Sequence, residues 1–196
     1  MASCQRKEFA VDKNDLIHTR NITVNTYEIG KNRLMIEGIL KDDRFFPSYF
    51  YSAKQFIDPG TIHHIIIRMN ISLPEIEITD AEAEMASVPS QLCREIKDIV
   101  TKLIGIRIRK GFTQKIRTVI GGTTGCLHMA NLIISMGSAA VQGQWAYYSR
   151  NRGGLHVRVP EVDLSLLLNS CWLWREDGPY YQRIIEMRRE QDKKEP

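Results

Sequence analysis

The spacing of apolar residues changes midway along this chain, and no other sequence feature constrains its fold as strongly. In the first half, apolar and polar side chains alternate, which is typical of strands with one buried face. Four stretches follow this pattern: residues 20–29, 33–40, 61–73 and 76–83. Short turns at Gly30-Lys31-Asn32 and Pro74-Glu75 join neighbouring stretches, so we expect a small antiparallel sheet of about four strands.

From Pro89 onward the apolar residues follow helical spacing. They recur three or four positions apart from Pro89 to Leu103, a second helix opens at Gly111, and a third runs from Gly125 to about Ser149. Strands followed by helices define an α+β fold. We therefore predict a small antiparallel sheet followed by three or more helices.

Length and composition indicate one domain. The chain has 196 residues, of which 43% are hydrophobic, so it can bury a core without disulfides. We expect a single domain over residues 14–185, with flexible tails at 1–13 and 186–196. The stretch Lys41–Pro59, which contains prolines and aromatic residues, is expected to form a long loop.

The charge pattern argues against a nucleic-acid partner, and the lack of long apolar stretches argues against a membrane partner. The net charge is +4, with basic and acidic residues interspersed. The basic residues at 107–110 and 115–117 therefore predict a solvated face rather than a nucleic-acid site. No stretch reaches the roughly 18 apolar residues that span a bilayer, and residues 1–8 form no apolar signal region. We expect a cytoplasmic protein with reduced cysteines and no membrane partner.

The strongest candidate for chemistry is a glycine-rich segment that leads into the third predicted helix, Gly121-Gly-Thr-Thr-Gly-Cys126-Leu-His128. Free N–H groups at a helix start stabilise a thiolate, the form of cysteine that binds metals or attacks electrophiles. The glycines permit positive φ angles and close backbone approach. His128 lies near enough to Cys126 to share a ligand or exchange a proton. The alternative is that Cys126 is a small buried hydrophobic residue.

The remaining cysteines and histidines suggest how a site could be completed. Cys93 begins the first predicted helix and Cys171 lies near the C-terminal turn. Together with Cys126 and His128 they would supply the three thiolates and one imidazole of a tetrahedral zinc or iron site. Taken singly, Cys93 and Cys171 are more often core residues, and their spacing matches no compact zinc finger.

Five other polar residues could contribute to the site. His63 and His64 are adjacent on a strand and face opposite sides, so we expect structural roles. His18 precedes the first strand and could approach the site. Asp80 and Glu82, at the sheet edge, are candidate carboxylates, although residues of this kind are more often surface charges.

Several segments together resemble an uncharacterised, mainly bacterial family of unknown function. They are Leu16–Arg20, Glu37–Asp42, Ile78–Met85 with Pro89 and Cys93, Leu103–Gly105, Lys110–Phe112 and Gly121–His128. The resemblance covers residues 14–185, and the Gly-Gly-x-x-Gly-Cys-x-His motif is its most specific part. It implies that Cys93, Cys126, His128 and Cys171 form one site. The family pattern has a histidine after the C-terminal cysteine, whereas this chain has Trp172. A more distant, fold-level likeness is to iron–sulfur scaffold and sulfur-acceptor proteins.

Three functions compete on this reading. The first is a metal-binding protein that holds zinc or an iron–sulfur cluster, with a role as an accessory or maturation factor. The second is a cysteine-dependent enzyme in which Cys126 is the catalytic nucleophile and His128 its acid or base. The third is a non-catalytic subunit or interaction protein, because no paired-carboxylate, Ser-His-Asp or phosphate-loop signature is present.

The third predicted helix also carries small residues between Gly137 and Gly143. Small side chains let another helix approach closely. The stripe is explained either by packing within the chain or by an interface with a second copy or a partner subunit. The second explanation predicts a homodimer, or a complex with a partner subunit, through Gly137–Gly143.

Overall fold

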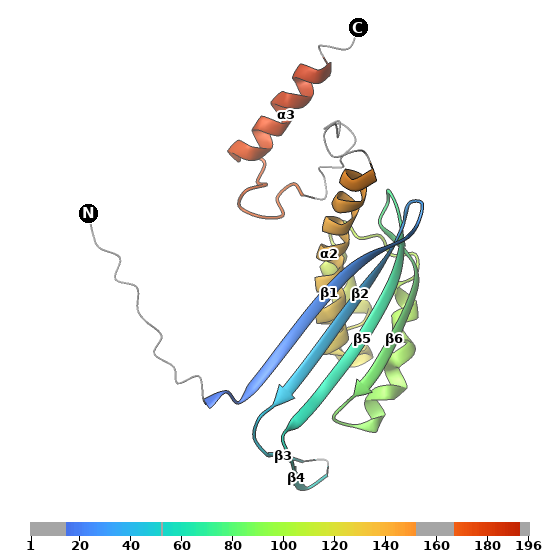
Figure 1. Ribbon diagram of the computed structural model, residues 1–196, viewed down its shortest axis with the longest axis vertical. Coiled ribbons are helices and arrows are strands. Elements are labelled where there is room, and N and C mark those ends of the chain that lie inside the picture. Colours follow the sequence, from blue (N-terminus) through green and yellow to red (C-terminus); the bar gives the residue numbers. More distant parts are fainter. Residues whose placement is uncertain (1–14, 52, 152–166, 193–196) are drawn as a thin grey trace, which may run out of the picture.

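The computed structural model describes residues 15–51, 53–151 and 167–192 (Figure 1). Its centre is one four-stranded antiparallel sheet in the order β1-β2-β5-β6. The strands are β1 (His18–Gly30), β2 (Arg33–Arg44), β5 (Gly60–Ser72) and β6 (Glu77–Ser87). All four occur where the two-residue period predicted them, and the α+β fold class is confirmed.

The stretch predicted as a long loop differs from the prediction. β2 continues to Arg44, and the following residues form a short hairpin of β3 (Ser48–Phe50) and β4 (Gln55–Ile57). Tyr49 lies directly opposite Phe56, and their rings meet edge to face with centroids 5.4 Å apart. Aromatic pairs of this kind stabilise two-stranded ribbons, which explains why this aromatic stretch is partly ordered as strand.

The helices follow the sheet, as predicted. They are the 3-10 helix η2 (Gln91–Leu103), α1 (Phe112–Val119), the short 3-10 helix η3 (Gly122–Thr124), α2 (Leu127–Asn151) and α3 (Pro179–Asp192). The end of α3 includes residues 186–192, which we had expected in a flexible tail. The other predicted tail, residues 1–13, lies outside the described residues.

The core lies between one face of the sheet and the helices η2, α1 and α2. In β2 every second residue from Leu34 to Leu40 is buried, and in β5 every second residue from Ile65 to Ile71. These rows meet α2 through buried side chains such as Leu132. At Gly38 an added Cβ would lie 2.5 Å from Met136 Sδ. Glycine therefore lets α2 lie close against the middle of the sheet.

The small-residue stripe of α2 is used, at least at its two ends, within the chain itself. A Cβ at Gly137 would lie 2.4 Å from a ring carbon of Phe112, and one at Gly143 would lie 2.5 Å from Thr26 Cγ2. Both glycines thus make room for neighbours in the same chain. The expected homodimer through this stripe stays a prediction.

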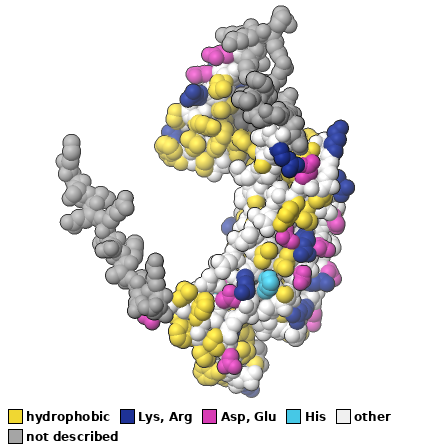
Figure 2. All heavy atoms as spheres, in the orientation of Figure 1, with side chains coloured by type: hydrophobic (Ala, Val, Ile, Leu, Met, Phe, Trp, Pro, Cys, Tyr) yellow, Lys and Arg dark blue, Asp and Glu magenta, His cyan; other side chains and the backbone are white. Residues whose placement is uncertain are grey.

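The opposite face of the sheet, which Figure 2 shows, carries charged side chains among hydrophobic ones. Basic and acidic side chains lie interspersed on it; Arg68, for example, donates to Glu37 at 2.9 Å and to Glu82 at 3.0 Å. Glu82 is therefore part of a surface ion pair, consistent with the surface-charge alternative. Within the described residues, no helix is both long and apolar enough to cross a membrane.

Candidate functional site

Three charged or polar side chains lie side by side across one end of the sheet. In the strand register Arg20 of β1 is opposite Asp42 of β2, and Asp42 is opposite His63 of β5. Because side chains alternate between the two faces of a sheet, Asp42 continues the buried row of Leu40 and His63 continues that of Ile65. The three side chains therefore lie on the face of the sheet that α2 covers.

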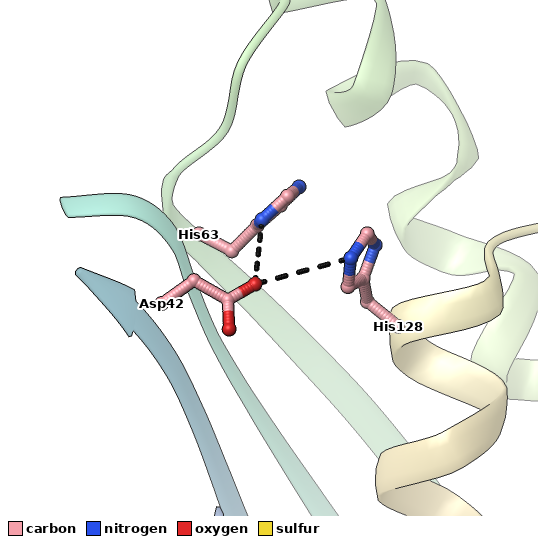
Figure 3. A group of neighbouring side chains, drawn as sticks. All are labelled: Asp42, His63 and His128. Atoms are coloured by element: carbon pink, nitrogen blue, oxygen red, sulfur yellow. Dashed lines mark hydrogen bonds and ion pairs between the residues drawn. The ribbon is translucent and has the colours of Figure 1, made fainter. Parts of the chain in front are cut away.

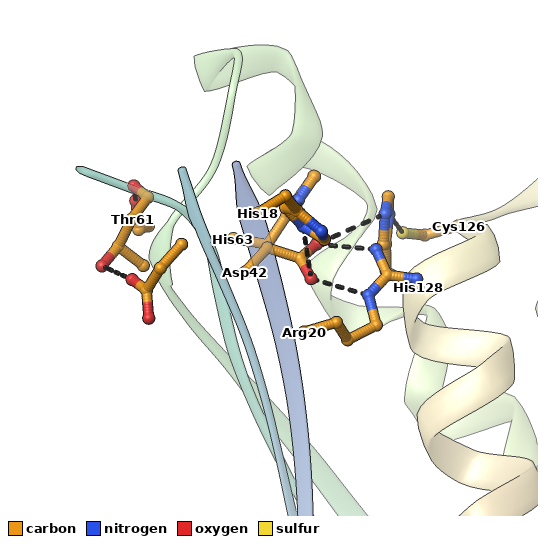
Figure 4. Close-up of polar contacts among 9 residues, drawn as sticks. His18, Arg20, Asp42, Thr61, His63, Cys126 and His128 are labelled. Atoms are coloured by element: carbon orange, nitrogen blue, oxygen red, sulfur yellow. Dashed lines mark hydrogen bonds and ion pairs between the residues drawn. The ribbon is translucent and has the colours of Figure 1, made fainter. Parts of the chain in front are cut away.

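Asp42 is the centre of this group and is only 1% exposed. Arg20 donates from Nε to Oδ1 at 2.6 Å and from Nη2 to Oδ2 at 2.7 Å, a bidentate pair. His63 Nδ1 lies 2.9 Å from Oδ2, and His18 Nε2 lies 3.6 Å from Oδ1 (Figure 4). His18 therefore lies beside this group. Each carboxylate oxygen thus faces one donor of Arg20 and at least one imidazole.

His128 completes the group from the first turn of α2. Its Nε2 lies 3.9 Å from Asp42 Oδ2, and its ring is stacked on that of His63 with centroids 3.9 Å apart (Figure 3). On the other side, its Nδ1 lies 3.9 Å from Cys126 Sγ. His128 therefore connects the glycine-rich segment to the polar row on the sheet.

The glycine-rich segment places Cys126 and His128 through close backbone contacts. A Cβ at Gly125 would lie 1.9 Å from the Ile120 carbonyl oxygen, and one at Gly121 would lie 2.6 Å from that of Arg117. The same Ile120 oxygen accepts the N–H of Cys126 at 2.8 Å. Only glycine permits this tight turn, which fixes the direction in which α2 begins and so aims His128 at the sheet.

Two groups of the cluster have shifted pKa values. Burial by itself raises the pKa of Asp42. The hydrogen bonds and charges of Arg20 and His63 lower it by more, so the pKa of Asp42 lies below that of an ordinary aspartate. Burial, followed by the charges of His63 and Arg20, lowers the pKa of His128. At neutral pH the site therefore contains a carboxylate and a neutral His128 imidazole, the forms in which these groups bind a metal.

A β-bulge lies directly beside the cluster. The register between β2 and β5 shifts after Asp42, so that Asp42 pairs with His63 and Asp43 with Thr61. The Thr61 hydroxyl donates to Asp43 Oδ1 at 2.6 Å. Bulges of this kind redirect side chains next to functional sites. Here the bulge lets Asp42 and Asp43 each find a separate partner.

The four residues predicted to share a metal do not come together as one group. Among the residues that the structure describes, the His, Cys, Asp and Glu side chains whose ligand atoms converge within 4.8 Å are Asp42, His63 and His128. Only His128 belongs to the predicted set. Cys126 adjoins it, whereas Cys93 is half-buried in η2 and Cys171 is exposed in the turns before α3.

Sequence reasoning missed two members of this group. His63 was expected to be structural, because it cannot bind a ligand together with the adjacent His64. That argument holds for His63 and His64 as a pair, but it does not consider the contacts of His63 with Asp42 of β2 and His128 of α2. Asp42 was assigned to a loop, although it lies in a segment used for the family resemblance and in phase with the apolar residues of β2.

The fold and the cluster together define an α+β protein in which a helix brings a histidine onto a buried carboxylate and a second histidine of an antiparallel sheet. The chain belongs to the family described as "Protein of unknown function (DUF2889)", whose match covers residues 18–142, well over half of the chain. This match includes every residue of the cluster. Searches of curated proteins and of solved structures found no match.

Proposed function

We propose that this protein binds a single divalent metal ion, zinc or iron(II), through Asp42, His63 and His128. The observation that carries the proposal is the convergence of Asp42 Oδ2, His63 Nδ1 and His128 Nε2. Neighbouring ligand atoms of a tetrahedral zinc ion lie about 3.4 Å apart, given metal–ligand distances of roughly 2.1 Å. The separations of 2.9 Å and 3.9 Å from Asp42 Oδ2 bracket that value.

The donor set favours an ion over an iron–sulfur cluster. Clusters are held by thiolates, whereas this group offers one carboxylate and two imidazoles. That combination suits zinc or the iron(II) of non-haem enzymes. Three protein ligands leave a coordination position open, which distinguishes catalytic from structural zinc sites. A metal bound there would supply Lewis-acid activation of a water molecule or a substrate oxygen.

Arg20 and His18 support such a site from its edge. Arg20 neutralises Asp42 and fixes the carboxylate plane by its two hydrogen bonds. His18 and Arg20 are 42% and 37% exposed, while His63 and His128 are 15% and 26% exposed. The ligands are thus sheltered but not sealed from solvent, and an anionic ligand would meet the Arg20 guanidinium.

The experiment is metal analysis of untagged protein, followed by calorimetric titration of chelator-treated protein with zinc and, without oxygen, with iron(II). We expect one ion per chain in the wild type and none in His63→Ala or His128→Ala. His64→Ala is the matched control, because His64 is the next residue of β5 and lies on the opposite face of the sheet. A wild type that binds neither ion, or equal loss in the control, would refute the proposal.

A second function, a cysteine-dependent enzyme, is favoured by one further contact. Cys126 Sγ lies 3.9 Å from His128 Nδ1, and the opposite nitrogen of the same ring faces Asp42. A thiol, an imidazole and a carboxylate in this order form the arrangement that activates a nucleophile. In metal-free protein, iodoacetamide should then modify Cys126 faster than the more exposed Cys171, and His128→Asn should abolish the difference. Slow modification of Cys126 in the wild type would exclude this function.

A further inference from the structure

A basic hollow lies at the other end of the sheet from Asp42. It has a volume of about 750 Å³ and is lined mainly by residues 102–115, which follow η2 and begin α1. Glu77, at the start of β6, also lines it and is paired with Ser72 of β5. Nine positions of β5 separate Ser72 from His63, or about 30 Å of strand. Figure 1 shows these opposite strand ends, so the hollow is separate from the Asp42 cluster.

The hollow concentrates positive charge. Its basic residues are Lys102, Arg107, Arg109, Lys110 and Lys115, and its acidic residue is Glu77. This excess of four positive charges equals the net charge of the whole chain. Glu77 accepts a hydrogen bond from Arg107 at 2.7 Å. In the described part of the chain the four other cations form no ion pair with a carboxylate, so their charge is available to a ligand.

Backbone hydrogen bonds hold the wall of the hollow in place. The segment Gly105–Ile108 runs along the free edge of the sheet and pairs with the start of β6. The N–H of Gly105 donates to the Ile78 carbonyl at 2.8 Å, and the N–H of Ile78 donates to that of Ile106 at 3.0 Å. A wall fixed in this way needs little reorganisation when a ligand binds, which favours affinity.

We propose that this hollow binds an organic polyphosphate of nucleoside diphosphate size. Four unpaired cations match the charge of two or more linked phosphate groups better than that of a single phosphate. Ile104, 49% exposed, gives an apolar surface for the organic part. The volume lies within the range of small-molecule sites. A nucleic acid would need a basic track beyond the hollow, whereas the outer sheet face near β6 is charge-balanced around Arg68.

The test is calorimetric titration of the full chain, treated with chelator, with ADP and with inorganic pyrophosphate. We expect one site for ADP, and weaker binding of pyrophosphate at the same site because it lacks the apolar part. Lys110→Glu/Lys115→Glu should weaken ADP binding at least about tenfold. The matched control is Lys31→Glu/Arg117→Glu, which makes the same charge change at exposed positions outside the hollow. It should leave the affinity within about twofold.

Three results would overturn the proposal. The first is no binding of ADP by the wild type at millimolar concentration, and the second is equal loss in both double variants, which would indicate unspecific charge attraction. The third is tight binding of a single-stranded oligonucleotide without terminal phosphates that ADP does not displace, which would assign the hollow to nucleic acid. Circular dichroism of each variant shows that the fold is kept. His63→Ala/His128→Ala should bind ADP normally, so this test is independent of the metal proposal.

Discussion

Asp42 and His63 lie directly opposite each other on neighbouring antiparallel strands, with Asp42 Oδ2 2.9 Å from His63 Nδ1. Both side chains thus start from rigid strands. His128 reaches the same carboxylate from the start of α2, which is packed against β2. Sites whose groups project from packed strands and helices keep their geometry better than sites built on loops. We therefore expect the group to be preformed before any ligand binds.

A preformed metal site should stabilise the fold when it is filled. Zinc at about one hundred times its dissociation constant adds about 2.7 kcal/mol to the free energy of unfolding. For a chain of this size that corresponds to a rise in Tm of roughly 5–10 °C. Thermal unfolding with and without zinc checks this. Asp42→Asn should remove the shift, whereas Asp43→Asn, changed at the next residue, should keep it. A shift of equal size in both variants would show that zinc acts elsewhere.

The ion pair of exposed Arg20 with buried Asp42 makes a prediction for acid stability. Because the folded pKa of Asp42 lies below its ordinary value, this group contributes stability that is fully present above about pH 4 and is lost as the pH falls through the folded pKa. In Arg20→Gln, the guanidinium charge that lowers the Asp42 pKa is gone, so burial raises this pKa. We expect the acid transition at higher pH and, at pH 7, a loss of roughly 1–3 kcal/mol, toward the lower end because Arg20 is 37% exposed.

Urea unfolding of chelator-treated protein between about pH 7 and pH 2 measures both the pH of the acid transition and the free energy of unfolding at pH 7. Arg33→Gln is the control, since Arg33 is exposed at the start of β2 and forms no ion pair within the described residues. Stability curves that stay parallel in Arg20→Gln and the wild type would mean that Arg20 does not control the ionisation of Asp42.

The alternation of apolar residues predicted the four long strands because it depends only on neighbours along the chain. Predicting the site required information that is not local to one stretch of the chain. Asp42 keeps the phase of Leu40, and His63 keeps that of Ile65, so the face of each could have been read from the alternation if the second predicted strand had been continued past Leu40. Their meeting depends on the register between β2 and β5, including a bulge, which no local pattern specifies.

Cysteine and histidine counts were a weaker guide. They grouped Cys93 and Cys171 with Cys126 because thiols are scarce in this chain, but scarcity carries no information about distance. The helix-start argument for Cys126 and His128 was local, and there the structure does bring the two side chains to 3.9 Å. The partners of His128 are Asp42 and His63 of the sheet, and residue counts do not indicate which side chains the strand register places beside a helix start.

Gly125 should be intolerant of any side chain. A Cβ there would lie 1.9 Å from the Ile120 carbonyl oxygen, a backbone atom that cannot move without breaking the turn before α2. We expect Gly125→Ala to lose more than about 2 kcal/mol of stability and to bind zinc more weakly, because His128 would be displaced. Urea unfolding and zinc titration test this. Thr123→Ala, an exposed change in the same segment, should alter neither; normal zinc binding in Gly125→Ala would contradict the role given to this turn.

A substitution at Gly137 distinguishes the two explanations of the small-residue stripe, packing within the chain and dimerisation. A Cβ at this position would lie 2.4 Å from the Phe112 ring, so Gly137→Ala should destabilise the folded chain by about 1–3 kcal/mol through overpacking. Phe112→Leu should relieve part of that loss in the double variant, since it removes the ring that the new methyl group meets. Sedimentation at several concentrations gives the oligomeric state of each variant. If Gly137→Ala instead converts a dimer to a monomer with unchanged stability of the fold, the stripe is an interface, and its contact with Phe112 is secondary.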